Sequence, residues 1–324
     1  MAANGLIHAV ELDAQGGCRR MSREETLGGP WPDALVWAHF NRKDPESVRF
    51  LRETSGLDSV ICDALLDDST RPRSVQFENG IVVIMRGVNL NPGEDPEDMI
   101  SMRLWIDDTR IISLRASKLQ AASDVLHLLE NKIGPKSPGG FLVTLAEALN
   151  DRMTPVVDEL EERVENVHEE TGTVSENQQL RRNLSELRRR AIALRRYIAP
   201  QRDMVRSLQR LSIDWLTIPH QIRLREAQDQ LTGFVEDLDA TRDHAYVAQD
   251  DIQSMLSDQM NRKMYLLSVI AGVFLPLGFL TGLLGVNVGG IPGSDSPIAF
   301  AIFCGMLAVL IVIQLILFRK MKWL

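Results

Sequence analysis

The sequence predicts an α+β domain followed by long helices and two C-terminal transmembrane helices. Residues 264–318 contain no Lys, Arg or Glu and a single Asp, Asp295, whereas residues 1–263 are rich in charge. Short apolar runs bounded by turn residues occupy the first third of the chain, and the pattern is almost wholly helical from about residue 140 onward. These three observations separate a soluble part from a membrane part.

Two segments of the apolar region are long enough to cross a bilayer. Residues 264–284 and residues 298–318 are each 21 residues long and uncharged. A helix needs about 20 residues to span the ~30 Å hydrocarbon core of a membrane. A buried core helix is the alternative interpretation of either run by itself, but two adjacent runs favour membrane spans.

Basic residues predict the orientation of these spans. The loop of residues 285–297 contains no Lys or Arg. The flanks on the other side of the two spans carry Arg262, Lys263, Arg319, Lys320 and Lys322. By the positive-inside rule, both termini are predicted to be cytoplasmic and the loop to lie outside. The N-terminus shows no charged start followed by an apolar core, so no signal peptide is predicted.

Composition excludes several classes of partner and site. The formal net charge is −8, which argues against nucleic acid as a partner because phosphate binding depends on Lys and Arg. The same charge is compatible with attracting cations. Cys18, Cys62 and Cys304 are far apart in sequence, so neither a disulfide framework nor a structural zinc site is predicted.

The first part of the chain predicts a small α/β domain with a mixed or partly antiparallel sheet. Two pairs of β-like runs flank short turns and indicate hairpins: residues 75–77 with 81–85, and residues 102–106 with 110–114. Helices are predicted around them at residues 45–54, 57–66, 117–131 and 140–167. Asp44 before Pro45 is a typical helix start.

The middle of the chain predicts a charged helical hairpin and a long final helix. Seven acids lie in residues 158–170 and seven arginines in residues 181–196, with a turn expected between them. Complementary faces of an antiparallel hairpin are one interpretation, and a cation-attracting acidic surface is another. A last helix from residue 220 to residue 284 would be on the order of 95 Å long, which requires support from other copies of the chain.

The expected organisation therefore has three parts. Residues 1–160 form the cytoplasmic α/β domain, residues 161–263 the charged hairpin and stalk helix, and residues 264–324 the transmembrane domain. Two helices cannot enclose a water-filled path, so any ion path requires several copies around one axis. Small and hydroxylated residues favour the first span as its lining.

The segment PLGFLTGLLGVNVGGIPG, residues 276–293, carries a family resemblance. The chain is identified as a member of the CorA metal-ion transporter superfamily, whose short outer loop begins Gly-Met-Asn. Here the triplet is Gly285-Val286-Asn287, directly after the first span. The valine and the following Gly-Gly-Ile-Pro-Gly resemble the zinc-transport (ZntB) branch of that superfamily.

The resemblance implies a funnel-shaped homopentamer in the bacterial inner membrane, with the first spans lining a central pore. The implied pore positions are Gly285, Val286, Asn287, Thr281, Gly278, Leu275, Leu267, Met264 and Asn261. The two leucines would be apolar constrictions, and five Asn287 carbonyls would face the water shell of the ion. The alternative for Asn287 is a local helix cap.

Acidic residues and histidines give no fixed metal site. Continuing the implied pore face into the stalk helix reaches Asp250 and Asp243, which are candidates for concentrating cations; the alternative is a solvated outer face. The six histidines, His8, His39, His127, His168, His220 and His244, have no pair within five residues, and none lies in a span. A tetrahedral zinc site on one helix is therefore not predicted.

The predicted function is transport of Zn²⁺, and the resemblance also suggests inward transport coupled to protons. No cofactor is expected, and no motif of an enzyme is found. The expected partners are further copies of the chain, the lipid bilayer, divalent cations and protons. A Mg²⁺ or Co²⁺ channel of the same superfamily is one alternative, and a non-conducting membrane-anchored scaffold or sensor is another.

Overall fold

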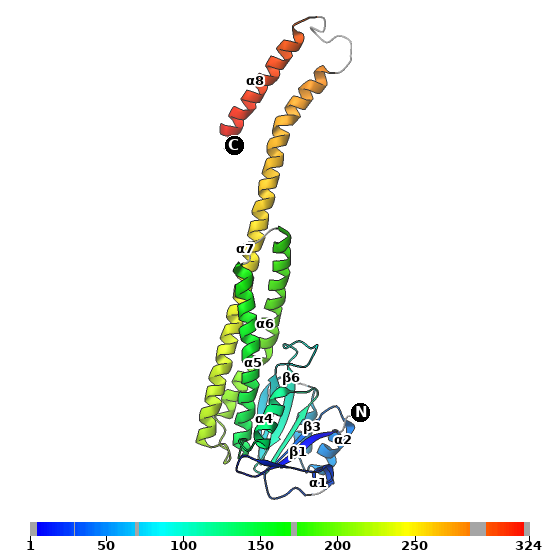
Figure 1. Ribbon diagram of the computed structural model, residues 1–324, viewed down its shortest axis with the longest axis vertical. Helices are drawn as coiled ribbons and strands as arrows, with labels where there is room; N and C mark the ends of the chain where they lie inside the picture. The colour runs from blue at the N-terminus through cyan, green and yellow to red at the C-terminus, as the bar shows by residue number, and fades with distance from the viewer. Residues whose placement is uncertain (1–4, 29, 69–70, 170–173, 286–295, 321–324) are drawn as a thin grey trace. The chain divides into compact units, whose positions relative to one another are not determined.

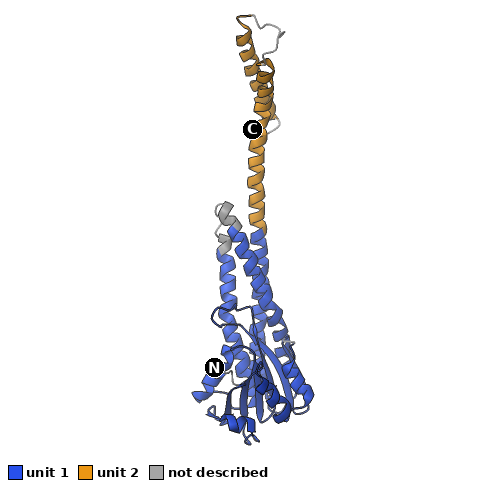
Figure 2. Cartoon of the chain, turned by 90° about the vertical axis from the view of Figure 1, so that its right-hand side faces the viewer, with its two compact units in different colours: residues 1–249 blue, residues 250–324 orange. Residues whose placement is uncertain are grey.

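A computed structural model of the chain describes residues 5–28, 30–68, 71–169, 174–285 and 296–320. It consists of two compact units, residues 1–249 and residues 250–324, which Figure 2 distinguishes by colour. The long helix α7 (Ile218–Leu284) contributes to both. The division of the chain into three functional segments stays a prediction.

In the described part of the first unit, seven strands form one mixed sheet with the order β2-β1-β3-β7-β6-β5-β4. β3 and β7 run parallel and the other neighbours are antiparallel. The strands are β1 (Leu6–Leu12), β2 (Cys18–Arg20), β3 (Val36–Asn41), β4 (Arg73–Phe77), β5 (Gly80–Gly87), β6 (Ile100–Ile106) and β7 (Arg110–Arg115). Both predicted hairpins and the mixed sheet are confirmed.

Strands β1, β2 and β3 were not predicted from the sequence. β3 is buried on both faces, so its residues VWAHF show no alternation that would distinguish a strand from a short core helix. Its position next to β7 depends on a parallel pairing between segments 74 residues apart, Val36 with Arg110. Local pattern carries no information about such a pairing.

Helices cover both faces of the sheet (Figure 1). On one face, Phe40 and Trp105 pack with Leu51, Ile61 and Leu65 in one core cluster. This cover consists of α1 (Arg23–Gly28), α2 (Pro45–Arg49), the π-helical turn η1 (Phe50–Thr54) and α3 (Ser59–Leu66). On the other face lie α4 (Gln120–Glu130) and α5 (Pro138–Glu169), as the 4.7 Å separation of the Trp37 and Phe141 rings indicates.

The predicted helix starts correspond to side-chain caps. Asp44 accepts a hydrogen bond from the Glu46 N–H at 2.9 Å, and Pro45 occupies the first helical position. Asp58 accepts one from the Val60 N–H at 2.8 Å, so α3 begins two residues later than expected. The helix predicted over residues 45–54 is present, but its second half is a π-helical turn.

The expected helical hairpin is formed by α5 and α6 (Val174–Leu208). Its arginines do not all face the acids of α5, as complementary charged faces would require. Arg190 pairs with Glu97 at 3.1 Å, and Arg195 pairs with Asp239 of α7 at 2.7 Å. Buried apolar residues of the two helices instead form the packed face: Leu160, Val164, Leu180, Leu184 and Leu187.

The final helices follow the predicted pattern closely. α7 begins at Ile218, two residues before the expected start, and continues through Gly233 and Pro276. α8 comprises Ala299–Lys320. α7 and α8 are each long and apolar enough over part of their length to cross a membrane. The predicted span 264–284 lies within α7, and the predicted span 298–318 begins one residue before α8.

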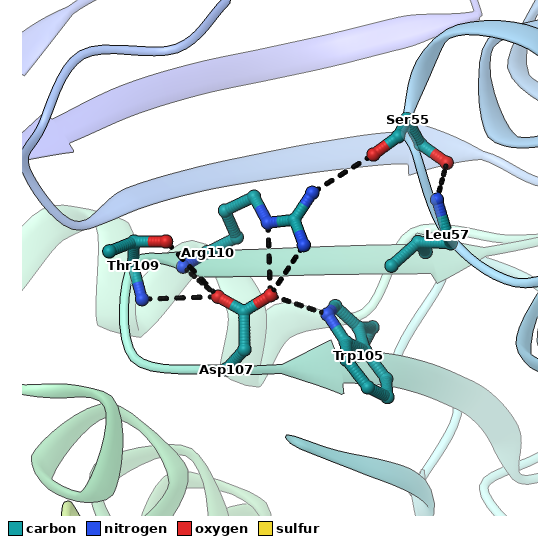
Figure 3. A network of polar contacts seen from close by, with 6 residues as sticks. All are labelled: Ser55, Leu57, Trp105, Asp107, Thr109 and Arg110. Carbon is teal, nitrogen blue, oxygen red and sulfur yellow. Dashed lines mark hydrogen bonds and ion pairs between the residues drawn. The ribbon is translucent and has the colours of Figure 1, made fainter. Parts of the chain in front are cut away.

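A polar network fixes the β6–β7 hairpin to the helical cover (Figure 3). The buried Asp107 accepts hydrogen bonds from the Trp105 indole at 2.8 Å and from the Thr109 and Arg110 backbone N–H groups. Arg110 also pairs with this carboxylate at 2.9 Å and donates to the Ser55 carbonyl at 2.9 Å. Because every buried oxygen of Asp107 has a donor, its charge is stabilised inside the fold.

Strand pairing brings two histidines together under α5. His8 of β1 lies opposite His39 of β3, with ring centroids 5.0 Å apart. The His39 Nδ1 is 2.7 Å from the Ser113 hydroxyl, which also accepts a hydrogen bond from Trp37 Nε1. Burial lowers the pKa of His39 well below its usual value. Burial, with help from Arg20 and Arg115, lowers the pKa of His8 to about 4.

We predict that the protein loses stability as the pH falls from 7 to 4. In this range the unfolded chain binds a proton at His8 and the folded chain does not, so the free energy of unfolding decreases with falling pH. The expected loss from His8 is about 3 kcal/mol by pH 4. Thermal unfolding of the detergent-solubilised protein at several pH values measures it. His8→Phe should flatten the slope of stability against pH.

Candidate ion path

One side of the first apolar segment of α7 is half-buried, and α8 contacts this side at Gly272. The half-buried positions of this segment recur at intervals of three and four residues: Val269, Gly272, Val273, Pro276, Leu277 and Leu280. On this side of the helix, Gln314 of α8 donates from Nε2 to the Gly272 carbonyl at 3.4 Å. Phe318 of α8 lies against Gly272 as well.

The residues that sequence analysis assigned to the pore lie on the other side of this helix. Leu275 follows Val273 by two residues, which is a rotation of about 200° around the helix axis. Leu275 is 71% exposed, Leu267 72% and Met264 61%, and Gly278 is exposed beside them. Within one chain, α7 thus has a face against α8 and an opposite apolar face without cover from the described residues.

The hydroxyl groups of the first span bond within their own helix. Ser268 donates to the Met264 carbonyl at 2.9 Å, and Thr281 donates to the Leu277 carbonyl at 2.9 Å. Their donor hydrogens are therefore used locally, while the oxygen lone pairs stay available. Thr281 lies at the border of the α8-facing side, and Asn261 is exposed one turn before Met264.

The helix ends where the predicted signature triplet begins. The Gly285 N–H still bonds to the Thr281 carbonyl at 2.9 Å, so Gly285 directly follows the last helical turn. Val286 and Asn287 lie outside the described residues. Their predicted roles in the path, and the local cap as the alternative for Asn287, stay predictions.

The two candidate acids of α7 differ in their surroundings. Asp243 pairs with Arg242 at 2.9 Å, which compensates part of its charge. Asp250 is exposed, and no ion pair to it is found among the described residues. Around Asp243, the opposite side of the helix is buried through Thr241, Ala245 and Ala248. Both acids are consequently open to solvent in one chain.

No resident metal site is formed by the described part of the chain, where no group of three or more His, Cys, Asp or Glu side chains gathers. Sequence spacing did not reveal that His8 and His39 become neighbours, because strand pairing joins them. Arg20 and Arg115 lie close enough to lower the pKa of His8. That positive potential, together with burial, makes the pair a poor ligand set for a cation.

A polar cavity of 510 Å³ is present in the first unit. The turns of the two predicted hairpins and the segment between α6 and α7 line it, with Phe77 and Trp215 as aromatic walls and Glu78, Asp108 and Asp214 as exposed acids. Arg110 partly offsets this charge. The acids are solvated and do not converge on one point with further ligands, so the cavity defines no metal centre.

Comparison with known proteins defines the class. Residues 32–320 match the family described as CorA-like Mg²⁺ transporter protein. The chain belongs to this family, and the predicted superfamily is confirmed. Its soluble α/β domain, long helix and apolar C-terminal helices therefore belong to a membrane transporter family and not to a class of enzymes.

Two relatives with curated names span nearly the whole chain. The divalent cation transporter CmaX of Pseudomonas aeruginosa is 38% identical over 322 residues, covering 99% of this chain and 97% of that protein. The zinc transport protein ZntB of Pectobacterium atrosepticum is 35% identical over 321 residues, with the same coverage of 99% and 97%. The predicted similarity to the ZntB branch is thus confirmed, with CmaX as a further similar protein.

Solved structures agree with the fold. Full-length CmaX superposes with a TM-score of 0.86 at 38% identity, covering 100% of this chain and 99% of that one. The CorA magnesium transporter of Methanocaldococcus jannaschii superposes with a TM-score of 0.82 at 16% identity, over 100% of both chains. The second comparison concerns the fold alone.

We predict that Asp250→Asn raises the cation concentration for half-maximal uptake about tenfold while the maximal rate is unchanged, because an exposed carboxylate raises the local cation concentration. Uptake into liposomes at low ionic strength measures both values, and added salt should reduce the difference. Asp251→Asn, a neighbouring exposed acid on a different side of the helix, is the matched control. Equal behaviour of the two variants would refute a special role for Asp250.

Proposed function

We propose that this chain transports Zn²⁺ across the bacterial inner membrane through a central pore, formed by the first spans of a homopentamer. The observation that carries the proposal is the division of the first span into two faces. One face is half-buried and contacts α8 of the same chain at Gly272, and Leu267, Leu275 and Gly278 are exposed on the other face. If further copies of the chain packed around a common axis, this second face would lie against the same face of the neighbouring copies and line the pore between them.

The side chains of this face suit a hydrated ion that moves through the pore without being held at a tight binding site. Apolar side chains at Leu267 and Leu275 provide constrictions that bind no cation, and Asn261 provides amide groups at the inner mouth. Asn287 would supply neutral carbonyl dipoles at the outer end, which attract the water shell of an ion weakly enough to release it. Asp250 in each copy would raise the cation concentration at the cytoplasmic side.

Zinc as the transported ion is supported by similarity. The ZntB relative carries zinc transport in its name, and the name of CmaX specifies divalent cations. Uptake linked to protons is part of the proposal, although neither span contains an acid or a histidine as a relay. The basic residues Arg262, Lys263, Arg319 and Lys320 support cytoplasmic termini.

We expect purified protein in liposomes to carry Zn²⁺ to an internal fluorescent dye, and Asn287→Ala to reduce this flux to the level of empty liposomes. The substitution would remove the Asn287 side-chain amides of all the copies around the pore, and these amides would be the first groups to contact the hydrated ion. Met306→Leu, at an exposed position of α8, is the control and should keep wild-type flux. A pH gradient across the liposome should change the wild-type rate.

Three other outcomes have distinct meanings. Flux of Mg²⁺ without Zn²⁺ from an assembled wild-type protein would make the chain a magnesium channel of the same family. Flux of neither ion would favour a membrane-anchored scaffold or sensor. Wild-type zinc flux in Asn287→Ala would contradict the role of that residue and leave the transported ion as proposed.

A further inference from the structure

Pro276 creates a hydrogen-bonding problem in the middle of the first span. In an α-helix the N–H of each residue bonds to the carbonyl four residues before it. Proline has no N–H, so the carbonyl of Gly272 lacks its helical donor. In the hydrocarbon core no water replaces that donor, and leaving a carbonyl without a hydrogen bond there is unfavourable.

The second span supplies a donor at this point. Gln314 is the sole residue of the segment 298–318 with an amide or charged side chain. Its Nε2 donates to the Gly272 carbonyl at 3.4 Å, and the residue is 8% exposed, whereas most of α8 is open. An amide in an apolar segment is costly unless it is bonded, and this amide lies against the carbonyl that proline leaves unpaired.

The absence of a side chain at residue 272 allows this contact. A Cβ atom at Gly272 would lie 2.8 Å from the Phe318 ring, which is closer than real Cβ contacts. Glycine therefore lets α8 approach the α7 backbone at the place where the backbone needs a donor. Pro276, Gly272, Gln314 and Phe318 form one interhelical unit, which we call the proline tether.

We propose that Gln314 is a positioning residue for ion transport: its side-chain amide replaces the N–H donor missing at Pro276 and so holds α8 to the first span. The tether includes Gly272, three residues before Leu275, and Pro276, two residues before Gly278, so it lies next to the candidate ion path on the same helix. It fixes the direction in which those residues project. The inference rests on the proposed function for its transport part and on the hydrogen bond alone for its structural part.

A double-mutant cycle isolates the tether. Gln314→Leu replaces the amide with an apolar side chain of similar size. Pro276→Ala restores a backbone N–H for the Gly272 carbonyl, so the amide becomes dispensable in that background. Ser268→Ala removes a hydroxyl that bonds within α7 and is the control, since its effect should be the same with Pro276 or alanine.

The expected result in liposomes is a maximal flux lowered about threefold to about twentyfold by Gln314→Leu, the range that one interhelical hydrogen bond in a membrane would give. The ion concentration for half-maximal flux should not change, because Gln314 touches no ion. In the Pro276→Ala background the same substitution should change the flux less than about twofold. The ion that the wild type conducts best, Zn²⁺ or Mg²⁺, is used throughout.

An infrared measurement tests the bond independently of conduction. With ¹³C at the carbonyl of Gly272, its amide I band should shift to higher frequency in Gln314→Leu and return in the double variant. Equal losses of flux with and without Pro276, or an unshifted band, would overturn the proposal. If Gln314→Leu does not assemble, recovery of assembly by the added Pro276→Ala supports the tether, and failure of the double variant overturns it.

The proposed function and this inference fail in different ways. A wild type that conducts neither ion, yet shows the infrared shift and its reversal, would refute transport and with it the positioning role, while the hydrogen bond would stand. A conducting wild type whose flux is indifferent to Gln314 would refute the positioning role and leave the proposed function intact.

Discussion

The hydrocarbon core of a bilayer offers no water to a backbone N–H or C=O group, and this constraint governs the C-terminal unit. It explains why both apolar segments are helices, in which each residue satisfies the backbone of another. It also explains why the one proline of the first span coincides with the one amide of the second. The two helices meet this demand at Gly272, whose carbonyl accepts from Gln314 and where an added Cβ would lie 2.8 Å from the Phe318 ring.

In the first unit, the main constraint is that polar groups buried in the sheet must have hydrogen-bond partners. Asp107 is held by Trp105, Thr109 and Arg110, so a charge lies inside the sheet edge without an unpaired oxygen. His8 and His39 stay neutral near neutral pH because burial lowers their pKa values. Neither arrangement belongs to a group of three or more His, Cys, Asp or Glu side chains in the described part of the chain that could hold a metal ion.

Transport and storage of a metal ion require opposite chemistry. A resident zinc site uses several thiolate or imidazole ligands at close range, and such a site would hold the ion too firmly to release it. The exposed face of the first span carries leucines and a glycine instead, while the Asn261 amide and the carboxylates lie on the part of α7 that precedes the span. An ion that keeps part of its water shell needs no such ligand set.

Much of this protein could be predicted from the sequence because the relevant physics is local. The two spans follow from length and apolarity, the cap of α2 from Asp44 before Pro45, and the hairpins from alternation around short turns. The family followed from the triplet at residues 285–287. Tertiary structure decided the features that join distant segments: β3 beside β7, His8 beside His39, Arg195 on Asp239 instead of α5, and Gln314 on the carbonyl released by Pro276. The local sequence shows which groups must be buried or hydrogen-bonded, but tertiary packing decides which distant residue becomes the partner.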